Sequence, residues 1–188
     1  MRDLSKLPDG LPVPVDDGAC SHLPGRRVPS LSLPSASGRH VDLAAVPGTA
    51  VVYFYPRIGN PHAPPPAGWN EIPGARGCTP QSCAFRDAHA DLVALGAEVY
   101  GVSAQPLAEQ QEATARLELP FELLNDRSLE LARAMRLPTF EHGGVTLIKR
   151  LTVIATGGRI EKVFYPVFPP DRSAIEVVDW LRSHPRQQ

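Results

Sequence analysis

Apolar residues fall into two kinds of pattern along this chain. At positions 50–55 they form an unbroken β-branched and aromatic run, Ala-Val-Val-Tyr-Phe-Tyr, which is typical of a central strand covered on both faces. From Thr79 to Leu95 they instead recur at steps of three and four, through Phe85, His89, Leu92 and Leu95. That spacing predicts a helix over 79–95, and Gly96 is a suitable residue to end it.

Elements of both kinds alternate over the rest of the chain. Further strands are predicted at Val28–Leu33, His40–Leu43, Glu98–Ser103, Phe121–Leu124, Val145–Thr156 and Arg159–Phe164. Further helices are predicted at Pro106–Leu117, Ser128–Met135 and Asp171–Ser183. The segments Ser35–Gly38 and Gly157-Gly158 are hairpin signals. A βαβ unit followed by a helix, a hairpin and a terminal helix predicts an α/β, thioredoxin-like fold with a mixed central sheet and helices on both faces.

Prolines are concentrated in the N-terminal part of the chain. Of 21 prolines, 14 lie within the first 80 positions, so we expect the front of the molecule to be rich in loops. We predict an irregular N-terminal arm over residues 1–24 and one domain over 25–184. Residues 56–77 form a predicted loop with six prolines and Trp69. Loops of that length inside a compact domain are usually functional or disordered.

Composition and charge argue against several classes of function but do not point to one. The formal net charge of −1 argues against binding to nucleic acid or to an anionic membrane surface. No window approaches the length of a membrane span, and residues 1–11 have no continuous apolar run, so we expect neither a membrane anchor nor a secretory signal. We therefore expect a cytoplasmic protein. Three cysteines in that compartment favour catalysis, metal binding or chance over a disulfide scaffold.

Two of the cysteines, Cys78 and Cys83, lie where the predicted 79–95 helix begins. A thiol at a helix N-terminus lies near unpaired backbone N–H groups and the positive end of the helix dipole, and both favour the thiolate. Arg76 adds a positive charge two residues before Cys78. Because a second thiol within reach can capture the oxidised form of the first, we interpret the pair as a redox centre.

Two other interpretations of these cysteines remain open. They could be inert buried thiols, or they could bind zinc, because Cys-x₄-Cys lies within zinc-ligand spacing and Cys20 and His22 could supply two more ligands. Taken alone, Cys20 is predicted to be a passive thiol of the arm. Arg86 and Asp87 are predicted to form a structural pair on the helix.

Arg150 is the charged residue that fits its surroundings least well. Strand alternation over 145–156 places Ile148, Arg150, Thr152 and Ile154 on one face. An arginine among apolar neighbours is seldom buried without a charged or functional partner. It is therefore either a solvent-exposed strand residue or a functional one.

Three landmarks make the chain resemble the peroxiredoxins, and among them the bacterioferritin-comigratory-protein (PrxQ) group. The strand Val51–Pro56 is similar to the family's strand that ends in its active-site proline. The segment Gly77-Cys78-Thr79, followed by Cys83 and by Phe85-Arg86-Asp87, resembles that group's signature. Arg150 lies where the family has its catalytic arginine. The resemblance covers about residues 25–184.

The resemblance implies a site and an activity. Cys78 would be the peroxidatic cysteine, which becomes a sulfenic acid, and Cys83 the resolving cysteine, which forms an intramolecular disulfide with it. Arg150 would stabilise the charge on the leaving oxygen, and Pro56 would shield the thiolate from water. The implied protein is a thiol-dependent peroxidase for hydrogen peroxide or small organic hydroperoxides, without metal, haem or flavin. Its implied partner is a thioredoxin- or glutaredoxin-like reductant, and it would be a monomer or weak homodimer.

The sequence departs from the family pattern Pro-x-x-x-Thr/Ser-x-x-Cys in two ways. Proline and cysteine are seven positions apart in the family, whereas Pro56 and Cys78 are 22 apart, which implies an insertion of 15 residues. The position three before Cys78 is Ala75, which has no hydroxyl, and Thr79 is the candidate to replace it. The alternative functions are a non-enzymatic redox sensor and a protein thiol–disulfide oxidoreductase. The second would favour Cys-x-x-Cys, which this chain lacks.

Overall fold

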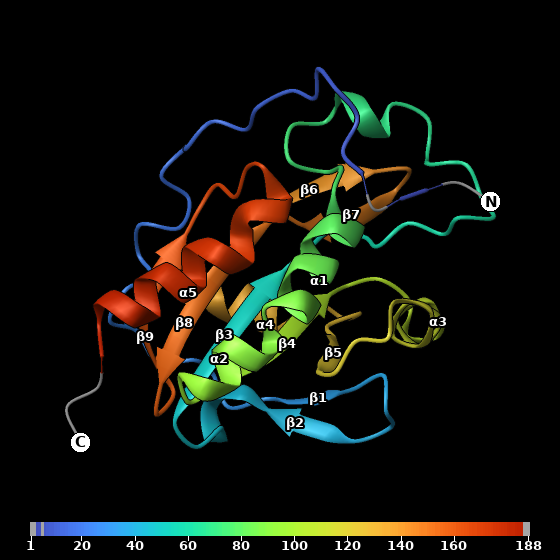
Figure 1. Ribbon diagram of the computed structural model, residues 1–188. Coiled ribbons are helices and arrows are strands. Elements are labelled where there is room, and N and C mark those ends of the chain that lie inside the picture. The colour runs from blue at the N-terminus through green and yellow to red at the C-terminus, as the bar shows by residue number, and fades with distance from the viewer. Residues whose placement is uncertain (1–2, 5, 186–188) are drawn as a thin grey trace.

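The computed structural model describes residues 3–4 and 6–185 and is built around a five-stranded sheet of order β5-β4-β3-β8-β9 (Figure 1). The strands are β3 (Thr49–Phe54), β4 (Ala97–Ser103), β5 (Glu122–Asn125), β8 (Leu151–Thr156) and β9 (Arg159–Phe164). Strands β3, β4 and β5 run parallel to one another, and β8 is antiparallel to both β3 and β9. The sheet is therefore mixed, and the thioredoxin-like prediction is confirmed.

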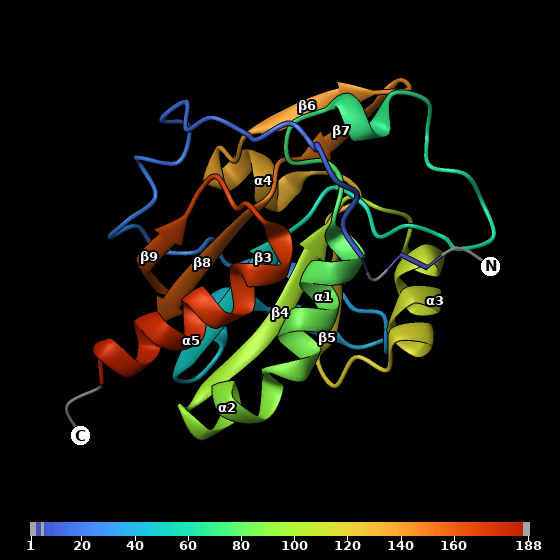
Figure 2. The same ribbon diagram turned by 45° about the horizontal axis from the view of Figure 1, so that its top comes forward.

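Each face of this sheet is covered by its own set of elements. Side chains alternate along β3, so Val51, Tyr53 and Tyr55 belong to one core cluster while Val52 and Phe54 belong to another. The first face is covered by α1 (Cys78–Asp87), α2 (His89–Ala94), α3 (Leu107–Leu117) and α5 (Ser173–Ser183). The second is covered by α4 (Glu130–Met135) and by the hairpin of β1 (Ser32–Pro34) and β2 (His40–Asp42) (Figures 1 and 2).

Residues of the predicted 1–24 arm contain no helix or strand where the structure describes them, and residues 1, 2 and 5 of the arm lie outside that part. The arm is nevertheless attached, because Leu4, Cys20 and Leu23 are buried. Among the helices of the described residues, none combines the length and the apolar character that a membrane crossing requires.

Three predicted elements were wrong in detail. The 79–95 helix is two helices that meet at Ala88, although Gly96 ends the second in a left-handed conformation, as predicted. The strand predicted over 28–33 is short, since β1 begins only at Ser32. The strand predicted over 145–156 is interrupted at Lys149 and Arg150.

The interruption at Lys149 and Arg150 has a structural reason. The chain before it, β7 (Val145–Ile148), pairs with a strand the sequence analysis missed, β6 (Thr139–His142), in a separate two-stranded sheet. The chain after it pairs with β3 and β9 in the main sheet. Because the strand changes partners, its alternation is reset, and Ile148 and Ile154 lie in different core clusters rather than on one face.

The long loop between β3 and α1 is ordered around one short 3₁₀ turn, Trp69–Glu71. We call residues 59–74 of this loop the insert. Trp69 is buried and forms a small apolar cluster with Ala75 and Leu147 of β7. The insert therefore packs against the β6–β7 hairpin rather than extending freely into solvent (Figure 2).

Candidate active site

Cys78 is the first residue of α1, the helix that follows β3 and the insert along the chain. Its predecessor, Gly77, caps the helix with φ 106°, a left-handed conformation that glycine adopts without strain. The first turn of a helix leaves backbone N–H groups without intrahelical acceptors, here those of Cys78 and Thr79. The Cys78 side chain is only 2% exposed, and its thiol donates to the carbonyl oxygen of Ala75 at 3.7 Å.

Arg150 contacts the sulfur of Cys78 directly. Its Nη2 lies 3.1 Å from Sγ and 3.2 Å from the carbonyl oxygens of both Ala75 and Arg76. Its Nε donates to the carbonyl of Gly74 at 3.3 Å. The guanidinium of Arg150 therefore joins the end of the insert to the thiol of Cys78, which lies 72 positions earlier in the sequence.

A buried polar chain positions the guanidinium from the other side. Arg150 Nη1 donates to the side-chain oxygen of Gln81, whose Nε2 donates to Ser173 Oγ at 3.2 Å. Ser173 Oγ is in turn 3.2 Å from Thr152 Oγ1. No role was predicted from the sequence for Gln81 or Ser173. The available signal was Gln81 itself, three residues after Cys78 and so on the same helix face.

No carboxylate of the described part of the chain pairs with the charge of Arg150. The residue is 3% exposed. Buried charges are normally paired, because an isolated one carries a large desolvation cost. Backbone carbonyls, the Gln81 amide oxygen and the Cys78 sulfur surround the cation instead. A thiolate at Cys78 would supply the missing counter-ion.

Cys83 lies on the same helix, partly buried against the core cluster of the α1 face. Burial raises the pKa of the Cys83 thiol above its ordinary value, while nearby Arg86 acts in the opposite direction. Positions five apart on an α-helix have Cα atoms about 8.6 Å apart, whereas a disulfide spans at most about 7 Å. The two thiols are free, and the intact helix holds them too far apart to bond.

The four residues considered for zinc are not assembled into one site. Cys20 belongs to the core cluster on the opposite face of the sheet from Cys78, and His22 contacts the carbonyl of Met135. Within the described residues, no group of three or more His, Cys, Asp or Glu side chains could hold a metal ion. Burial raises the pKa of Cys20 to about 12, which keeps its thiol protonated at neutral pH.

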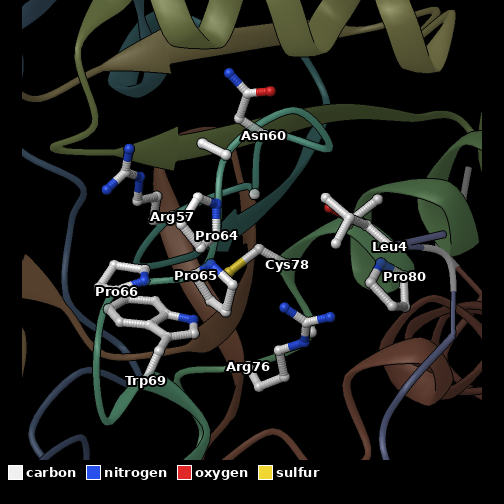
Figure 3. A pocket seen from close by; sticks show the side chains of 14 residues that line it. Leu4, Arg57, Asn60, Pro64, Pro65, Pro66, Trp69, Arg76, Cys78 and Pro80 are labelled. Carbon is white, nitrogen blue, oxygen red and sulfur yellow. The ribbon is translucent and has the colours of Figure 1, made fainter. Parts of the chain in front are cut away.

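The remaining candidates have different surroundings. Thr79 and Arg76 line a pocket of about 50 Å³ that Cys78 also lines (Figure 3). Pro56 is buried at the end of β3, where its carbonyl accepts from Ser103, and it does not line this pocket. Arg86 pairs with Asp87 at 2.9 Å and donates to the Leu117 carbonyl of α3, which is a structural role.

The sequence as a whole matches known proteins over most of its length. Residues 23–178 match the model of the Redoxin family. Peroxiredoxin Q of Sedum lineare, a chloroplastic protein, is 32% identical over 85% of this chain and 77% of its own length. The chain belongs to the peroxiredoxin Q family. Peroxiredoxin Q of Oryza sativa subsp. japonica is also 32% identical, and the match spans 66% of that protein, just under two thirds of its length.

Solved structures of peroxiredoxins share the fold. Peroxidoxin BcpB from Mycobacterium tuberculosis aligns with a TM-score of 0.71 at 23% identity, covering 86% of this chain and 98% of that one. The bacterioferritin comigratory protein of Xanthomonas campestris aligns with a TM-score of 0.67 at 21% identity, covering 93% and 98%. The family pattern has Thr or Ser three positions before the cysteine. Here that residue is Ala75, which contributes a buried carbonyl rather than a hydroxyl to the site.

Proposed function

We propose that the protein is a thiol-dependent peroxidase in which Cys78 is the peroxidatic cysteine. The observation that carries this proposal is the buried, carboxylate-free guanidinium of Arg150, 3.1 Å from the Cys78 sulfur at the start of α1. Membership of the peroxiredoxin Q family and the alkyl peroxide reduction named for the Xanthomonas campestris relative support it. The proposed substrates are hydrogen peroxide and small organic hydroperoxides.

In the proposed first step the Cys78 thiolate attacks the terminal oxygen of the hydroperoxide. The S–O bond forms as the O–O bond breaks, which leaves a sulfenic acid and releases water or an alcohol once the leaving oxygen takes up a proton. Arg150 and the free N–H groups at the start of α1 are placed to stabilise the charge that develops on these oxygens. Thr79 lines the same pocket and is the proposed hydroxyl donor in place of the missing one at Ala75.

In the proposed second step the Cys83 thiol gives up its proton and its sulfur attacks the sulfenic acid sulfur. The S–S bond forms as the S–O bond breaks, and the hydroxyl group leaves with that proton as water. A thioredoxin- or glutaredoxin-like dithiol then reduces the disulfide. Because the intact helix separates the two cysteines, the first turns of α1 must unwind before the bond can close. Pro80 is an ordinary first-turn proline, because an N–H at its position would have no intrahelical acceptor. The first helical bond that the opening must break is that of the Gln81 N–H to the Gly77 carbonyl, at 3.0 Å.

The rate of oxidation of Cys78 tests the proposed function. We expect the reduced protein to react with hydrogen peroxide orders of magnitude faster than a free thiolate, and Cys78→Ser to abolish the reaction. Stopped-flow tryptophan fluorescence can follow it, since Trp69 lines the pocket of Cys78. Cys83→Ser should keep the fast first phase and accumulate the sulfenic acid. A rate equal to that of a free thiolate, with the disulfide still forming cleanly, would favour the redox sensor.

Hydrogen exchange tests the opening of α1. We expect backbone amides of residues 77–86 to exchange faster in the disulfide form than in the reduced form, because closing the bond removes helical hydrogen bonds. Exchange in α3 should be the same in both states, which provides an internal control. The Cys83→Ser variant should show no such difference after treatment with oxidant. Equal exchange of residues 77–86 in the two forms would rule the opening out.

A further inference from the structure

The insert covers the reactive sulfur. Its residues Pro64, Pro65, Pro66 and Trp69 line the same pocket as Cys78, on the other side of the sulfur from Pro80 of α1 (Figure 3). In the family pattern the chain between proline and cysteine is too short to form such a cover. The wall that faces the sulfur is therefore built largely from residues that the relatives' pattern lacks.

This cover is fixed at its ends and in its middle. Arg116 of α3 donates to the carbonyl of Gly59 at 3.0 Å, and Arg150 donates to that of Gly74 at 3.3 Å. Between them, Trp69 is 5% exposed and packs against Phe140 and His142 of β6, with ring centroids 6.1 and 5.4 Å apart. Proline rings add stiffness, since they fix φ. The cover therefore acts as a wall of defined position.

The space beneath the cover is small. The pocket volume is about 50 Å³, which corresponds to a few water molecules when each needs about 10–15 Å³ of such space. Pockets that hold drug-sized organic molecules are typically about 300–1,000 Å³. Hydrogen peroxide fits into this volume whole, whereas the aromatic group of a bulky hydroperoxide would have to stay at the mouth of the pocket, against the insert.

We propose that the insert is a size filter that admits hydrogen peroxide to Cys78 and excludes bulky organic hydroperoxides, with Trp69 and Pro65 as specificity-determining residues. This inference rests on the proposed peroxidase function and narrows its substrate class. The filter acts on access to the sulfur, and the chemical step is the same for every hydroperoxide that reaches it.

The test compares second-order oxidation rates with hydrogen peroxide and with cumene hydroperoxide. For the unmodified protein we expect a ratio in favour of hydrogen peroxide that exceeds the ratio of a free small-molecule thiolate by at least about 10- to 200-fold, the discrimination that a pocket achieves against a single methylene group. Trp69→Ala and Pro65→Gly should each lower this ratio by admitting the larger substrate.

Two variants serve as matched controls. Trp180→Ala removes the other tryptophan, which stacks on His184 of the C-terminal segment, and Pro47→Gly changes an exposed proline before β3, outside both the insert and the pocket. Both should leave the ratio unchanged.

Three other outcomes would overturn the size filter, and one of them would also overturn the peroxidase proposal. Equal rates with both hydroperoxides in the unmodified protein would overturn the filter and leave the peroxidase proposal standing. A high ratio that neither Trp69→Ala nor Pro65→Gly lowers would also overturn it, because discrimination would then lie elsewhere. Rates no faster than a free thiolate with either substrate would overturn the peroxidase proposal and the filter together. Circular dichroism on each variant excludes unfolding as the source of a changed ratio.

Discussion

Replacing Arg150 by methionine is expected to slow the oxidation of Cys78 by hydrogen peroxide about 10²- to 10³-fold, the usual effect of removing one charge-stabilising donor from a transition state. Methionine keeps much of the apolar volume but removes the N–H groups that contact Cys78 and the carbonyls of Gly74, Ala75 and Arg76. Stopped-flow oxidation of the reduced variant provides the measurement.

Two further variants make the Arg150 experiment specific. Arg150→Lys keeps the charge but loses the planar fork, so it should recover only part of the rate if geometry matters as well as charge. Arg172→Met removes an exposed arginine from the segment before α5 and should leave the rate unchanged. A folded Arg150→Met protein that reacts as fast as the unmodified one would remove Arg150 from the mechanism.

Substituting alanine for Gly77 is expected to reduce the free energy of unfolding by about 2–4 kcal/mol, from left-handed strain and overpacking together. Gly77 has φ 106°, and a Cβ there would lie 2.4 Å from Pro170 Cγ and 2.8 Å from Leu7 Cδ2. Relief of that overlap must shift the start of α1, so the oxidation rate of Cys78 should fall as well. Urea unfolding of the reduced protein measures the loss of stability.

Gly96→Ala is the matched control for Gly77→Ala. Gly96 also has a positive φ, 73°, but nothing lies within 4 Å of the Cβ position. The Gly96→Ala variant should therefore lose only the free energy that the left-handed conformation costs a non-glycine residue, about 1–2 kcal/mol. Its Cys78 should be oxidised at the unchanged rate. Equal destabilisation by the two substitutions would show that packing against Pro170 contributes nothing.

The sequence was most informative where one local pattern determines the outcome. The apolar run at 50–55 became β3, and the placement of Cys78 at the start of a helix was also correct. The β6–β7 hairpin could have been predicted, because Gly143-Gly144 separates two short strand-like runs. The break at Ala88 could not, because neither glycine nor proline marks it and the apolar spacing continues across it.

Features that depend on a strand changing its sheet, or on contacts between residues distant in sequence, could not be predicted from the sequence. Alternation placed Arg150 on a strand face, but the residue lies where the chain leaves one sheet for another, and from there its side chain contacts Cys78. The support from Gln81 and Ser173 joins α1 to α5 across 92 positions, which no local pattern encodes. Likewise, the composition of the insert indicated a functional loop without showing that it would cover the sulfur.

The two arginines that hold Gly59 and Gly74 also explain how a long segment can be accommodated here at all. Closing a flexible loop becomes only slowly less favourable with length, and going from seven positions to 22 costs about 1 kcal/mol. Because Arg116 and Arg150 hold the two ends of the insert and Trp69 holds its middle, the residues between these three points can change in length and composition while the anchored points stay in place. Residues 60–68 and 70–73 are thus natural positions for exchanging segments, and grafting other loops between the same anchors would give a series of proteins with one reaction centre and different entrances.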